Sequence, residues 1–123
     1  MSAGDFLKVA AGQVRQASMM LKQEAQGMLS ERENTARQKS SSITEAQLKL
    51  RGKQIELNDP NKDQREKQET AREVIKLQQE ISTEQHEMQD ITQKLADGAN
   101  KKQSQAQQLD GRASDLEAQA SAL

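Results

Sequence analysis

Apolar residues recur at alternating steps of three and four along the second half of the chain, and this heptad spacing limits its folds more than any other feature. The clear part of the stripe contains Val74, Leu77, Ile81, Met88, Ile91 and Leu95, with Glu84 as a polar interruption. After a one-residue shift near Asp97-Gly98 it continues as Ala99, Lys102, Ala106, Leu109, Ala113, Leu116, Ala120 and Leu123. A stripe this narrow is typical of a two-stranded coiled coil rather than of a wide globular bundle.

The first half of the chain begins with a matching pattern, in which small and large residues alternate. Its members are Ala3, Leu7, Ala10, Val14, Ala17 and Leu21. The two halves are separated by Asn58-Asp59-Pro60-Asn61, which holds the only proline of the chain. Asp59 is a good N-cap and Pro60 suits the first position of a helix. We therefore expect a turn at 58–61 and a second helix directly after it.

Folding the chain at this turn brings two distant segments of matching chemistry together. A residue i then faces a residue j when the two numbers add to about 119, as in an antiparallel pair of helices. This register places Ala10 opposite Leu109 and Leu7 near Ala113, so that small residues face large ones. The sequence predicts an all-α fold, a long antiparallel two-helix coiled-coil hairpin. The predicted intramolecular seam consists of Leu7, Ala10, Val14, Ala17, Leu21, Val74, Ile81, Met88, Leu95, Ala106, Leu109, Ala113 and Leu116.

We expect a single domain over 1–123, with a first arm at about 3–57, the turn at 58–61 and a second arm at about 62–122. Ser2 followed by Asp5 resembles a capping box, which favours a helix start near residue 3. The stretch 30–42 contains no apolar residue larger than one alanine. It leaves two interpretations open: a continuous but poorly packed helix, or a break near Ser40–Ser42.

Composition excludes several function classes. Hydrophobic residues make up 33% of the chain, and it has one Phe, no Tyr, no Trp and no Cys. Disulfides, thiolate nucleophiles and cysteine-based zinc sites are thereby excluded. The lone histidine, His86, is followed by Glu87 and Asp90, but a metal site needs further ligands and a pocket. We expect no catalytic site, no metal and no cofactor, and the chain lacks the clustered Lys/Arg of a nucleic-acid surface.

No segment has the length and apolarity of a membrane span, and the N-terminus lacks the apolar stretch of a secretory signal. We therefore expect a cytoplasmic or assembly-associated protein, with its compartment undetermined. Near the N-terminus, however, apolar residues exceed what the seam needs. These candidate partner-binding residues are Phe6, Val9, Met19, Met20, Met28 and Leu29. These residues either broaden the hairpin's own seam or form a docking surface for a partner or a second copy. In a third interpretation they lie on a membrane surface, together with Lys8, Arg15 and Lys22 at heptad spacing.

The layout of two helices around Asn58–Asn61 resembles that of needle-type filament subunits and of coiled-coil stalk proteins in bacterial secretion systems. Hairpins of this kind also occur in phage virions and scaffolds. The resemblance implies a non-enzymatic structural subunit of a larger bacterial or phage assembly, with partners that are copies of itself or other helical proteins. The alternative is a small adaptor or chaperone that holds a partner helix against its N-terminal apolar face. A membrane-surface helical protein is the third hypothesis.

Overall fold

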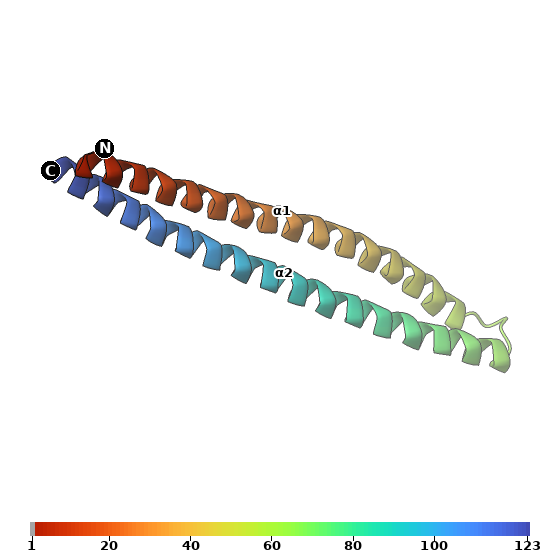
Figure 1. Cartoon of the computed structure of the whole chain (residues 1–123). Coiled ribbons are helices and arrows are strands. Elements are labelled where there is room, and N and C mark those ends of the chain that lie inside the picture. Colours follow the sequence, from red (N-terminus) through yellow and green to blue (C-terminus); the bar gives the residue numbers. More distant parts are fainter. Residues whose placement is uncertain (1) are drawn as a thin grey trace. The chain divides into compact units, whose positions relative to one another are not determined.

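The computed structural model describes residues 2–123, which form two long α-helices, α1 (Ala3–Leu57) and α2 (Gln64–Ala122). The helices are antiparallel and pack against each other, so that the two ends of the chain lie side by side (Figure 1). No strand occurs among these residues. The predicted all-α helical hairpin is confirmed.

Helix α1 begins where its capping residues predict. The Ser2 hydroxyl accepts a hydrogen bond from the Asp5 backbone N–H at 3.1 Å, and Ser2 is the residue before the first helical position. The helix then continues without a break through Ser40–Ser42. In this stretch Lys39 is half-buried and forms ion pairs with Glu84 and Glu87 of α2. These cross-helix contacts replace the apolar residues that the segment lacks.

The connection between the helices is longer than the sequence predicts. The Asp59 carboxylate accepts the Asn61 backbone N–H at 2.9 Å, so Asp59 stabilises the turn itself. The cap of α2 is Asp63, whose carboxylate accepts the Glu66 N–H at 2.8 Å. The prediction that Asp59 caps the second helix, with Pro60 in its first position, is therefore wrong, because the carboxylate of Asp59 is used within the turn.

The chain divides into two compact units, and both helices contribute to each. The terminal unit consists of residues 2–32 and Lys94–Leu123, and the turn unit consists of Glu33–Gln93. In the turn unit the buried side chains are Ile43, Thr70, Val74 and Ile81. Met88 is half-buried on the same stripe, so the predicted seam positions of this unit lie at the helix contact.

The terminal unit is held together by small residues that lie seven apart on both helices. On α1 these are Gly4, Ala11, Ser18 and Ala25, and on α2 they are Ala99, Ala106, Ala113 and Ala120. Ala99, Ala106 and Ala113 are fully buried. The Ser18 hydroxyl donates to the Ala106 carbonyl oxygen at 3.1 Å, and a Cβ placed on Gly4 would lie 3.5 Å from the Ala120 carbonyl oxygen. Contacts from one helix to the backbone of the other require a close approach of the two helices.

Larger side chains alternate with this small-residue ladder and lie half-buried at its edge. Those predicted for the seam are Leu7, Val14, Leu21, Leu95, Leu109 and Leu116. Two predicted seam residues do not hold the central positions of the contact. Ala17 is exposed and Ala10 is only half-buried, because Ser18 and Ala11 hold the central positions.

The predicted register between the two arms is also wrong. The hydrogen bond from Ser18 to Ala106 fixes the register, and one heptad closer to the chain ends Ala11 lies level with Ala113. Ala10 therefore does not lie opposite Leu109. Small residues therefore face small residues, not large ones. Part of the shift follows from the turn, because α2 begins at Gln64 and not at the predicted 62, which moves the sum of facing residue numbers from about 119 to about 121, whereas Ser18 and Ala106 add to 124.

Candidate interaction surface

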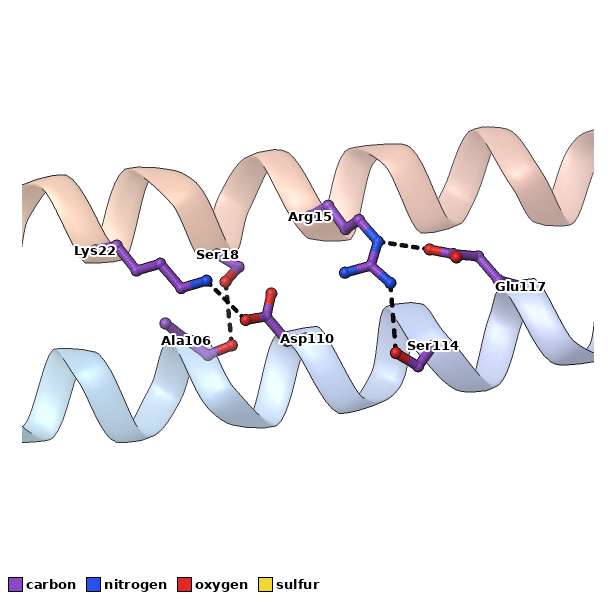
Figure 2. A network of polar contacts seen from close by, with 7 residues as sticks. All are labelled: Arg15, Ser18, Lys22, Ala106, Asp110, Ser114 and Glu117. Atoms are coloured by element: carbon purple, nitrogen blue, oxygen red, sulfur yellow. Dashed lines mark hydrogen bonds and ion pairs between the residues drawn. The ribbon is translucent and has the colours of Figure 1, made fainter.

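One flank of the terminal unit carries a network of polar contacts between the helices (Figure 2). Arg15 donates from Nε to Glu117 Oε1 at 2.5 Å and from Nη2 to Ser114 Oγ at 3.4 Å. One heptad further along α1, Lys22 Nζ lies 2.8 Å from Asp110 Oδ2. Both cations therefore extend from α1 toward α2 rather than away from the hairpin.

The pKa values of these groups shift in the directions that ion pairing requires. The hydrogen bond from Lys22, with the Ser18 hydroxyl nearby, lowers the pKa of Asp110 below 3.8. The hydrogen bond from Arg15 lowers the pKa of Glu117 below 4.5 and raises the pKa of Arg15. All four charged side chains are partly exposed, so solvent screens each ion pair. The network therefore orients the side chains of Arg15 and Lys22 toward α2 more than it stabilises the fold.

A different face of α1 carries no charge over almost six helical turns. Its positions, which we call the uncharged face, are Ala3, Phe6, Val9, Ala10, Gln13, Gln16, Ala17, Met20 and Gln23. By helical position they lie beside and behind the small-residue ladder, away from the flank that carries Arg15 and Lys22. Phe6 is 65% exposed, Met20 58% and Val9 49%. In a chain with 30% charged residues, a long face without charge and with large exposed apolar side chains is a candidate interaction surface.

The other candidate partner-binding residues lie elsewhere. Met28 is half-buried, and its sulfur would lie 3.1 Å from a Cβ placed on Gly98, so it belongs to the contact between α1 and α2. Leu29 is half-buried, one heptad after Lys22 on the flank of the polar network. Met19 is exposed, but it lies one helical position away from Met20 and outside the uncharged face.

No arrangement suited to metal binding occurs within residues 2–123: they contain no group of three or more His, Cys, Asp or Glu side chains close enough to share an ion. His86 is exposed and lines a shallow surface hollow with Ser82 and Gln85. Neither α1 nor α2 is apolar enough over a sufficient length to cross a membrane.

Comparison of the chain with models of protein families, with characterised proteins and with solved structures gives no match. Its function has to follow from its own surfaces. The class that the fold defines is a helical hairpin of two antiparallel helices. Within that class, this chain is distinguished by a small-residue ladder between its helices and by an uncharged face on α1.

Proposed function

We propose that this protein is a non-enzymatic coiled-coil subunit of a larger assembly, and that it contacts its neighbours through the uncharged face of α1. The single observation that carries the proposal is the position of Phe6. It is the only aromatic residue of the chain, and its side chain is 65% exposed instead of buried between the helices. Aromatic side chains supply a large share of the contact energy at protein interfaces, where they are enriched.

The resemblance of the hairpin layout around Asn58–Asn61 implies, as part of this proposal, an assembly such as a secretion apparatus or a phage virion. The same face also supports the second candidate function, an adaptor or chaperone that binds one partner helix. The two differ in stoichiometry, because a subunit associates with copies or neighbours while an adaptor stays small without its client. A membrane-surface role has weaker support, because Arg15 and Lys22 form ion pairs with α2.

Sedimentation velocity of the purified chain over a roughly hundredfold range of concentration tests the subunit proposal, since association depends on concentration. We expect species larger than the 13.7 kDa monomer as the concentration rises. The double variant Phe6→Gln/Met20→Gln should remain monomeric. The matched control is Leu48→Gln/Ile55→Gln, which removes two apolar side chains of α1 that are 65% and 68% exposed in the turn unit.

The second measurement is the particle size of the native protein in an extract of the source cells. A subunit should migrate well above 13.7 kDa, and the Phe6→Gln/Met20→Gln variant should not. A protein that stays monomeric both in the extract and after purification would contradict the proposal. If the control variant lost association as strongly as the Phe6/Met20 variant, the uncharged face would not be the contact surface.

A further inference from the structure

We propose that the uncharged face binds a second copy of the same chain, with the two α1 helices antiparallel and related by a two-fold axis at Gln13. This inference rests on the proposed function, because it names the partner of the same surface. Each copy would contribute the same residues, as a two-fold interface requires. Four helices would then meet in the terminal units of the two hairpins.

The uncharged face repeats the small–large pattern that already pairs α1 with α2. In the small-residue ladder, each small residue of α1 is followed three positions later by a large one, as in Ala11 and Val14. On the uncharged face, Ala3, Ala10 and Ala17 lie seven apart, and each is followed three positions later by a longer side chain: Phe6, Gln13 and Met20. Helix α1 therefore carries two stripes of the same design, displaced by one residue. The first packs on α2, whereas on the second only Ala10 is half-buried and the other members are exposed.

The register between α1 and α2 shows how two such stripes pair. Ser18 of α1 contacts Ala106 of α2, so small residues of one helix face small residues of the other. The larger side chains of the two helices then lie at the same height along the hairpin. The same register applied to two antiparallel copies of the uncharged face places Ala10 opposite Ala17 of the second copy. Phe6 then faces Met20 of the second copy, and Gln13 meets its own counterpart. Contacts between a methionine sulfur and an aromatic ring are favourable, and the two-fold axis makes this contact twice.

Charge selects the antiparallel orientation. Glu24 follows the uncharged face on the same side of α1, where it pairs with Lys102 of α2. In the antiparallel register Glu24 lies level with Ala3 of the second copy, next to a helix N-terminus, where a negative charge is favourable. A parallel pairing would instead bring the two Glu24 side chains level with each other, and their like charges repel.

The size of the surface predicts a reversible dimer. The exposed surface of Phe6, Val9 and Met20 would be covered in the dimer together with that of three alanines and three glutamines. The surface buried on both copies would total about 1,000 Å². This lies near the lower limit for a specific interface. We therefore expect a dimer that dissociates on dilution, which sedimentation can follow.

Disulfide trapping tests the proposal directly, because the chain contains no cysteine. In the full-length Gln13→Cys variant, the two thiols of a dimer lie at the axis and should link under mild oxidation. In Met20→Cys, the antiparallel helices hold the two thiols about 20 Å apart, too far for a disulfide. We also expect a tagged Phe6→Cys chain to link to an untagged Met20→Cys chain. The matched control is Gln108→Cys on the exposed surface of α2.

Two results would overturn the inference: linking of Gln13→Cys no faster than that of Gln108→Cys, or linking of Met20→Cys to itself as fast as Gln13→Cys. The second would indicate a parallel pair. If Gln13→Cys fails to link while the native protein still migrates as a large particle that depends on Phe6 and Met20, the second-copy inference fails alone. If the native protein is monomeric, the proposed function fails as well.

Discussion

The small-residue ladder predicts that one enlarged side chain separates the helices of the terminal unit. Ala106 is fully buried, and its carbonyl oxygen accepts the Ser18 hydroxyl at 3.1 Å. Ala106→Leu keeps helix propensity nearly constant but adds a branched side chain where another helix lies in contact. The helices must move apart to admit it.

Overpacking of this kind costs about 1–3 kcal/mol of the free energy of unfolding. For a chain of 123 residues, each kcal/mol corresponds to a fall in Tm of about 4 °C, so Ala106→Leu should melt about 4–12 °C below the parent. Thermal unfolding followed by far-ultraviolet circular dichroism measures this shift. At a fixed low protein concentration the comparison is between monomers, so association does not enter the measured difference.

The matched control is Ala118→Leu, which makes the same change at an exposed position of α2. Its effect should stay within about 0.5 kcal/mol, as is usual for surface substitutions. If Ala106→Leu melted within about 2 °C of the parent, the close approach of the helices at Ser18 and Ala106 would be refuted.

Three further predictions concern single positions. Gly111→Ala should raise the free energy of unfolding by about 1 kcal/mol in urea titrations, because a Cβ at this position meets nothing within 4 Å. Gly98→Ala should raise the free energy of unfolding by less, because its Cβ would lie 3.1 Å from the Met28 sulfur. Asp63→Ala should lower stability by about 1 kcal/mol through loss of the α2 cap, seen as a lower urea midpoint. The pKa of Asp110 is lower in the folded chain than its ordinary 3.8, so the ionised carboxylate stabilises the fold fully above pH 3.8, and this stabilisation is lost as the pH falls below that value. Asp110→Asn should therefore reduce the dependence of the urea midpoint on acid pH.

Periodicity predicts the two helices and most of the α2 stripe, and the sequence at Asn58–Asn61 predicts a turn between them. Ile91 of the predicted stripe is exposed. The N-terminal part of α1 differs, since Ala3, Ala10 and Ala17 lie one residue before Gly4, Ala11 and Ser18. Both sets repeat every seven residues, and hydrophobicity favours the alanines over a glycine and a serine. The structure buries Ala11 and Ser18 of the other set, and the Ser18 hydroxyl bonds to a backbone carbonyl across the close contact.

The same ambiguity limits the prediction of the candidate site. Phe6, Val9 and Met20 are recognisable in the sequence as surplus apolar residues, whereas Met28 lies seven residues after Leu21 and so continues the stripe of Leu7, Val14 and Leu21. The proximity of the Met28 sulfur to Gly98 agrees with this spacing and places the methionine between the helices. What the spacing does not give is which of the two neighbouring seven-residue sets of α1 faces α2, and this decides how far Phe6, Val9 and Met20 lie from the contact.

The pairing of the two chain ends has a consequence for how the protein is made. Contacts near the turn join residues close in sequence, such as Lys62 and Thr70, which are eight residues apart, whereas Arg15 and Glu117 are separated by 102. Local contacts form first because they close shorter loops. During synthesis, both stripes of the N-terminal arm remain uncovered until Lys94–Leu123 has emerged from the ribosome. The contacts of the terminal unit are therefore the last that a growing chain can make, and a chain that ends before residue 94 lacks the α2 partner of residues 2–32.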